Sequence, residues 1–153
     1  MLELIRPAGV GVAVFLGYWL GEDPVARFHI MGPLSCMIMA GTVAYESIMT
    51  GERAPSKTGY QPDRAYQIQS GLANAAMAIT AALVWLCGWG PFAEAAIVTV
   101  VLLFFSLSAA NHLRTAILFH NMKPVNLLRP LVTLLLLGAL IPPMLQALSR
   151  AGR

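Results

Sequence analysis

The sequence predicts an all-α integral membrane protein, a single bundle of about five transmembrane helices joined by short loops. Apolar residues make up 58% of the 153 residues and charged residues only 11%, whereas soluble domains are nearer one quarter charged. The mean hydropathy is +0.69. Five apolar segments follow one another, and we take residues 1–153 as one polytopic domain with spans at about 4–20, 28–49, 67–89, 93–119 and 127–148.

The first segment is the shortest, and two interpretations of it are weighed. It begins beside the "RP" pair, where Pro7 suits an early helical position. A secretory signal peptide would place its basic residue first and end in a small-residue cleavage site. Here Glu3 precedes Arg6, and no such site follows the apolar run. We therefore expect a retained first helix.

The other four segments each exceed the roughly 20 residues that a helix needs to cross the hydrocarbon layer. Because the bilayer interior offers no water to backbone groups, each of these spans must be helical. Gly and Pro punctuate the connections. The short "GWGP" connection predicts an antiparallel hairpin of the third and fourth spans. In the third span Gly71, Ala78 and Ala81 are small enough for a neighbouring helix to approach closely.

Basic residues predict the orientation in a cell (inner) membrane. Cytoplasmic loops of membrane proteins carry an excess of Lys and Arg. Six of the ten basic residues lie on the side shared by the N-terminus and the second and fourth loops, namely Arg6, Arg53, Lys57, Arg64, Lys123 and Arg129. Three lie on the opposite side, namely Arg27, Arg150 and Arg153. The N-terminus is therefore predicted to be cytoplasmic and the C-terminus external.

Polar residues within the spans gather at one depth. Ionisable side chains are costly in a bilayer and mostly face a bundle interior or a water-filled cavity. With a rise of about 1.5 Å per residue, Glu46 and His112 come to lie at the same level of their helices. The whole predicted layer is Arg6, Glu46, Gln67, Asn74, Asn111, His112 and Arg114. The outer half of the spans holds little that is comparable.

This layer predicts a polar cavity facing the inner leaflet that binds a lipid-like or small polar ligand. Glu46 and His112 are the candidate catalytic residues, because a carboxylate and an imidazole together can perform acid–base chemistry. Glu46 is expected to pair with Arg114 or His112. A purely structural interpretation, with interhelical hydrogen bonds and snorkelling arginines, stays open. The candidate ligand-binding residues are Arg6, Gln67, Asn74, Asn111 and Arg114.

Two other classes of function stay open. The chain would suit a non-catalytic subunit or assembly factor of a larger membrane complex. It would also suit a small-solute transporter or a channel built as a homo-oligomer, although the apolar outer half counts against a pore through one chain. The bilayer itself is the one partner that composition predicts directly.

Several kinds of site are not supported by the motifs. The basic residues form no stripe, which argues against nucleic acid. His29 and His112 lie near opposite ends of their spans and cannot share a haem iron. No Cys/His cluster has zinc spacing, so no metal site is predicted, and no pattern identifies a cofactor. His29 is interpreted as an interfacial residue. Tyr45, Tyr60 and Tyr66 are interpreted as an inner aromatic belt.

Overall fold

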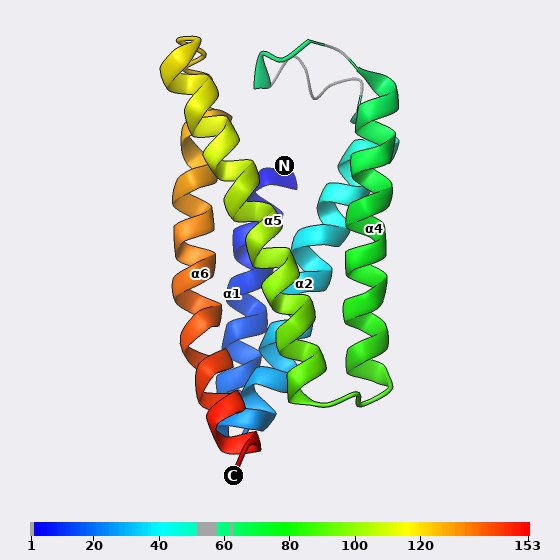
Figure 1. Cartoon of the computed structure of the whole chain (residues 1–153), viewed down its shortest axis with the longest axis vertical. Helices are drawn as coiled ribbons and strands as arrows, with labels where there is room; N and C mark the ends of the chain where they lie inside the picture. The colour runs from blue at the N-terminus through cyan, green and yellow to red at the C-terminus, as the bar shows by residue number, and fades with distance from the viewer. Residues whose placement is uncertain (1, 52–57, 62) are drawn as a thin grey trace.

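The fold is an all-helical bundle, as the sequence predicts. The computed structural model describes residues 2–51, 58–61 and 63–153. Within them the chain is 87% helical with five helices and no strands. The helices are α1 (Leu2–Leu20), α2 (Pro24–Met49), α4 (Arg64–Leu86), α5 (Pro91–Leu118) and α6 (Pro124–Ala151) (Figure 1).

Four of these helices are long and apolar enough to cross a membrane, namely α2, α4, α5 and α6. In α1, residues Ile5–Leu20 form a shorter apolar helix. Large apolar side chains are exposed on the outer faces of the bundle, far beyond what a soluble monomer carries. Those on α5 and α6 include Leu103, Leu107, Leu134 and Leu135, each at least 57% exposed. The composition and this exposed apolar surface together identify a membrane protein.

The long helices begin two to four residues before the apolar segments do, because polar caps and prolines start them in the interface. Pro24, Pro91 and Pro124 each occupy a first helical turn, where a missing N–H costs nothing. The Asp23 carboxylate accepts hydrogen bonds from the backbone N–H groups of Val25 (2.8 Å) and Ala26 (3.0 Å). The Ala26 hydrogen bond, with a smaller effect from Val25, holds the pKa of the Asp23 carboxyl below its ordinary value.

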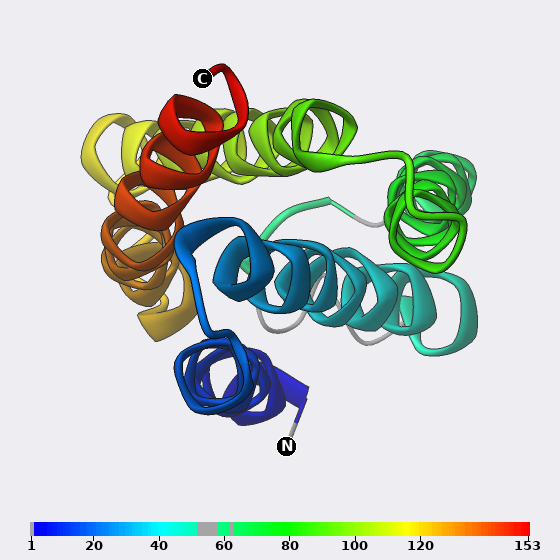
Figure 2. The same cartoon turned by 90° about the horizontal axis from the view of Figure 1, so that it is seen from below.

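Helix α2 is the centre of the bundle and contacts all four other described helices, as the view along the bundle shows (Figure 2). Its buried residues Phe28, Met31 and Cys36 belong to the core, and Val98 of α5 packs over the same end. Helix α4 packs closely on α2 because of the predicted small residues. A Cβ atom placed on Gly71 would lie 3.1 Å from Ser47 Cβ.

The connections divide between two ends of the bundle (Figure 1). The α2–α4 and α5–α6 connections lie at one end, called here the loop end. The α1–α2 and α4–α5 connections and the C-terminus lie at the other, called the C-terminal end. The α2–α4 and α5–α6 connections thus share one end, as was assumed when the basic residues on each side were counted. Arg53 and Lys57, which contribute to that count, lie outside the described residues.

Candidate functional site

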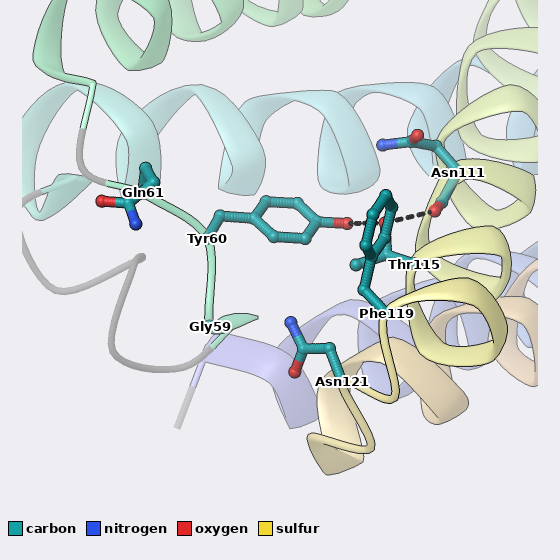
Figure 3. Close-up of a pocket in the computed structure, with 7 residues that line it drawn as sticks. All are labelled: Gly59, Tyr60, Gln61, Asn111, Thr115, Phe119 and Asn121. Carbon is teal, nitrogen blue, oxygen red and sulfur yellow. Dashed lines mark hydrogen bonds between the residues drawn. The ribbon is translucent and has the colours of Figure 1, made fainter.

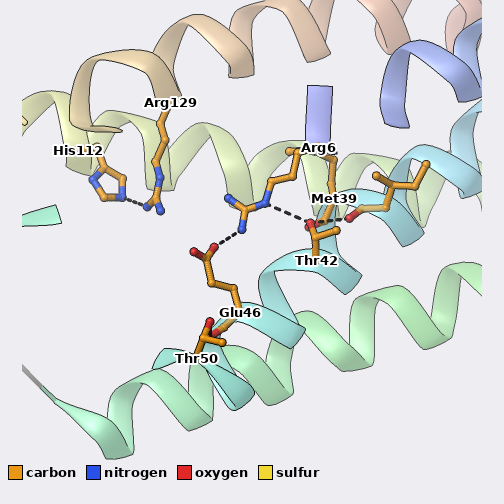
Figure 4. A network of polar contacts seen from close by, with 8 residues as sticks. Arg6, Met39, Thr42, Glu46, Thr50, His112 and Arg129 are labelled. Atoms are coloured by element: carbon orange, nitrogen blue, oxygen red, sulfur yellow. Dashed lines mark hydrogen bonds and ion pairs between the residues drawn. The ribbon is translucent and has the colours of Figure 1, made fainter. Parts of the chain in front are cut away.

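A buried ion pair joins α1 to α2 near the loop end. Arg6 is 7% exposed and Glu46 is 9% exposed. The Arg6 Nη2 atom is paired with Glu46 Oε2, and the Nε atom of Arg6 donates to Thr42 Oγ1 at 3.1 Å (Figure 4). Thr42 in turn donates to the Ile38 carbonyl at 2.7 Å. The guanidinium is therefore held by two side chains of the central helix, in the fork geometry that arginine offers.

His112 of α5 is the centre of a second buried group and is 4% exposed. The Arg129 Nη1 atom of α6 contacts its Nε2. A guanidinium can only donate, so Nε2 must accept and the ring proton lies on Nδ1. Nδ1 lies 2.7 Å from Asn126 Oδ1 and 3.0 Å from the Tyr60 hydroxyl, and both oxygens can accept from it. His112 thus has polar partners at both ring nitrogens.

The segment 58–61 packs against α5 and α6 at the loop end. The Tyr60 ring stacks on the His112 ring, with centroids 5.3 Å apart and planes 7° from parallel. Fully buried Asn126 donates to the Thr58 carbonyl at 3.2 Å and to the Asn121 carbonyl at 3.0 Å. Asn121 also donates to the Thr58 carbonyl, at 2.7 Å. One asparagine therefore ties together the segment, the α5–α6 connection and His112.

A pocket of about 520 Å³ lies between this segment and the end of α5 (Figure 3). The Tyr60 side chain lines it, and the Tyr60 hydroxyl donates to Thr115 Oγ1 at 3.3 Å. Thr115 donates to the Asn111 carbonyl at 2.9 Å. The described lining residues are uncharged, and they are Gly59, Tyr60, Gln61, Asn111, Thr115, Phe119 and Asn121.

The two buried groups face each other across the bundle. In Figure 4 the guanidinium of Arg129 points from α6 toward the place where Arg6 meets Glu46. Four helices thus contribute ionisable or amide side chains to one level: α1, α2, α5 and α6. Tyr60 links this buried polar layer to the pocket, because it touches His112 and also lines the pocket.

A second polar pair lies at the C-terminal end. His29 Nδ1 of α2 lies 2.5 Å from Oε1 of Glu94, which is in the first turn of α5 and only 1% exposed. This pair adds a buried carboxylate at the end of the bundle that the sequence predicts to be the outer one, where little polarity is expected. His29 itself is partly exposed near the start of α2. Glu94 lies among apolar neighbours at a helix start, so hydropathy alone treats it as part of a terminus.

The comparison with protein families decides the relationship of the chain. The model of a family described as "Family of unknown function (DUF6790)" matches residues 24–153. The chain belongs to the DUF6790 family. No curated protein and no solved structure matches it. The DUF6790 match includes Glu46, His112 and Arg129, whereas Arg6 lies before it.

Among the candidate residues predicted in this DUF6790 chain, Arg6, Glu46 and His112 lie in the buried layer. Asn111 lines the pocket. The ion pair of Glu46 is with Arg6. Arg114, one of its two expected partners, is instead exposed and lies 6.0 Å above the Phe119 ring.

Two further candidates, Gln67 and Asn74, are on α4. Asn74 is fully buried, and its amide donates to the Ser70 carbonyl at 2.9 Å, one turn earlier in α4. The side-chain oxygens of Gln67 and Asn74 are buried and have no hydrogen-bond partner. These two residues are therefore separate from the Tyr60 pocket, since neither lines it.

Sequence reasoning misses the roles of Arg129, Asn126 and Tyr60. Position along the chain assigns Tyr60 to an interfacial belt, but its ring turns inward onto His112. The same reasoning places Asn126 in a loop and treats Arg129 only as a topological charge. A signal is present nevertheless, because Asn126, Arg129 and Thr133 follow a spacing of three and four, which is one face of a helix.

Proposed function

We propose that this multi-pass membrane protein binds a lipid-like or small polar ligand in the pocket beside Tyr60. The observation that carries the proposal is the continuity of that pocket with the buried layer. Tyr60 lines the pocket and is fixed from behind by His112, which Asn126 and Arg129 fix in turn. A rigid wall of this kind is what ligand recognition requires, because its groups are already oriented before binding.

The lining chemistry favours an uncharged hydrogen-bonding group on the ligand. Amide and hydroxyl side chains surround the pocket, and Phe119 offers an apolar face. A volume of about 520 Å³ falls within the usual 300–1,000 Å³ of small-molecule sites. A hydroxyl, carbonyl or amide head with an apolar remainder would satisfy both kinds of surface. The exposed apolar flanks of α5 offer such a remainder a path from the bilayer.

The contacts favour binding over acid–base chemistry. Both ring nitrogens of His112 already have partners, and the Glu46 carboxylate is paired with Arg6. We therefore propose Asn111 as a ligand-contacting residue, with Arg6, Glu46 and His112 as positioning residues behind the pocket wall. Arg114 reaches the pocket through Phe119, on which it packs.

The proposal predicts that Asn111→Leu lowers ligand retention without unfolding the protein. Asn111 is exposed in the pocket, and Leu removes its amide while adding bulk there. Loss of one hydrogen bond is worth about 1 kcal/mol, or about fivefold in affinity. Wild type and variant are purified gently from the same cells, and the compounds that stay bound are measured by mass spectrometry.

Gln69→Leu is the matched control, since Gln69 is an exposed amide on α4 outside the pocket. A defined compound held by the wild type and by Gln69→Leu, but reduced at least about fivefold in Asn111→Leu, is the expected result. Equal retention by all three proteins, or bulk lipid alone in the wild type, would overturn the proposal.

We also propose that the loop end faces the cytoplasm. The prediction is that a membrane-impermeant maleimide added to intact cells labels Cys87 and leaves Cys36 unlabelled. Cys87 is exposed beside the α4–α5 connection at the C-terminal end, whereas Cys36 is buried in α2. Cys87→Ser should abolish the labelling. Labelling that requires disruption of the membrane would reverse the orientation.

A further inference from the structure

A second pocket, of about 320 Å³, lies at the C-terminal end of the bundle. It is formed where the α1–α2 connection and the start of α2 meet the α4–α5 connection. Its lining includes two carboxylates, Asp23 and Glu94, and no Lys or Arg side chain from the described residues, while the charges of Arg150 and Arg27 act on Asp23 from outside the lining. This pocket is separate from the one beside Tyr60 and shares no lining residue with it.

The Glu94 carboxylate is buried and only half satisfied. Its residue is 1% exposed, and Oε1 contacts His29 Nδ1 at 2.5 Å. Oε2 is buried and has no hydrogen-bond partner. Buried carboxylate oxygens normally have partners, because leaving one without a donor costs free energy. An N–H donor is therefore the chemical group that the site lacks.

Helix α5 does not use this carboxylate for its own cap. Gly90 is the N-cap, and no side chain caps the helix. The first turn of a helix nevertheless favours a negative charge, since its free N–H groups carry partial positive charge. Glu94 is thus placed where its charge is favoured. Among the described residues, its ion-pair partner is the imidazole of His29, which is charged only when protonated.

The pocket wall leaves room beside the carboxylates. Gly88 and Gly90 have positive φ angles of 60° and 92°, and no heavy atom lies within 4 Å of a Cβ atom placed on either. The side chain of His29 is 41% exposed. Among the residues described, no group of three His, Cys, Asp or Glu side chains could hold a metal ion. The size and the ligand set therefore favour an organic cation over a bare ion.

We infer that this pocket binds the primary ammonium group of a small organic amine. One ammonium N–H donates to the Glu94 carboxylate and a second to Asp23, while Val25, Ala26 and Pro91 contact the carbon chain. The ammonium charge offsets the buried carboxylate, and its protons supply the missing donor. A quaternary ammonium has the charge without the N–H groups, so the site should discriminate against it.

The test uses the full-length wild type in detergent or nanodiscs at constant ionic strength. It is titrated with n-butylammonium chloride, tetramethylammonium chloride, n-butanol and calcium or zinc chloride. Binding is followed by calorimetry and by the fluorescence of the three tryptophans, of which Trp85 has its ring 6.3 Å from the His29 ring. We expect saturable binding of butylammonium with a Kd on the order of 1 mM, as befits so few ligand atoms. Tetramethylammonium should bind at least about tenfold more weakly.

Glu94→Gln should weaken butylammonium binding at least about tenfold. Glu22→Gln, which changes an exposed carboxylate in the α1–α2 connection, should not weaken it. If Glu94→Gln does not fold, the selectivity of the wild type still decides. An equal response to tetramethylammonium or butanol, or no saturable response to butylammonium, would overturn the inference and leave an interhelical contact. A response to the divalent ions alone would overturn it in favour of a metal site.

Discussion

Glu46→Gln is expected to lower the free energy of unfolding by about 3 kcal/mol. The substitution keeps the size of the side chain and removes its charge, so that Arg6, which is 7% exposed, loses the ion pair with Glu46. Removing one member of a buried pair costs more than the pair contributes, because the remaining charge stays desolvated. The measurement is reversible unfolding in mixed micelles, followed by circular dichroism.

Two comparisons make this expectation specific. Glu22→Gln makes the same chemical change at an exposed residue and should stay within about 0.5 kcal/mol of wild type. The double variant Arg6→Met, Glu46→Leu should recover more than half of the loss, since an apolar pair of similar volume replaces the ion pair. Arg6→Met and Glu46→Leu are also made singly, and if their losses simply add in the double variant, Arg6 and Glu46 do not act as a unit.

The sequence determines depth well in a protein of this kind. Hydropathy bounds each span, and the constant rise of a helix then fixes how far along the bundle a residue lies. That is why hydropathy and helical rise suffice to assign Arg6, Glu46 and His112 to one buried level. The all-α fold follows equally directly, because only helices can satisfy the backbone of apolar segments this long.

The direction in which a side chain points around its helix is harder to predict from the sequence than its depth. Glu46 has Arg6 as its ion-pair partner, whereas Arg114 at a similar level is exposed beside Phe119. To predict which of two arginines at one depth pairs with Glu46, one must know how α1 and α5 pack around α2. The spacing of residues within one helix does not give this information. For the same reason, the environment of a residue type that is stable in more than one place is hard to predict. A tyrosine such as Tyr60 suits an interface and a buried ring stack equally.

Segments just outside the apolar runs are where prediction from the sequence is least complete. Asn126 and Glu94 both lie within the first turn of a helix, two and three residues after the proline that begins it. A hydropathy profile treats such residues as interfacial, yet the helix carries them into contact with neighbouring helices. Asn126 is fully buried and Glu94 is 1% exposed. Both residues therefore make buried contacts of the kind that a hydropathy profile would expect only within the spans.

Asn126→Asp is expected to destabilise the protein by about 3 kcal/mol and to open the loop end. The change replaces an amide donor by a carboxylate oxygen of the same shape. That oxygen would face the Thr58 and Asn121 carbonyls, which Asn126 Nδ2 now approaches to 3.2 and 3.0 Å. Two hydrogen bonds become two repulsive contacts, and a negative charge is buried in a site that is fully closed to solvent.

The consequence reaches the pocket through Thr58, because Asn126 Nδ2 donates to the carbonyl of that residue in segment 58–61, whereas the Oδ1 acceptor beside His112 Nδ1 is kept in the variant. Hydrogen exchange of residues 58–61 should therefore rise together with the loss of stability, and the ligand retained by the wild type should be lost. Gln69→Glu is the matched control, since it makes the same amide-to-carboxylate change at an exposed residue outside the pocket, and it should change stability by less than about 0.5 kcal/mol. Unchanged exchange in segment 58–61 despite lost stability would mean that Asn126 supports only the helices. The pocket wall would then depend on Tyr60 stacking alone.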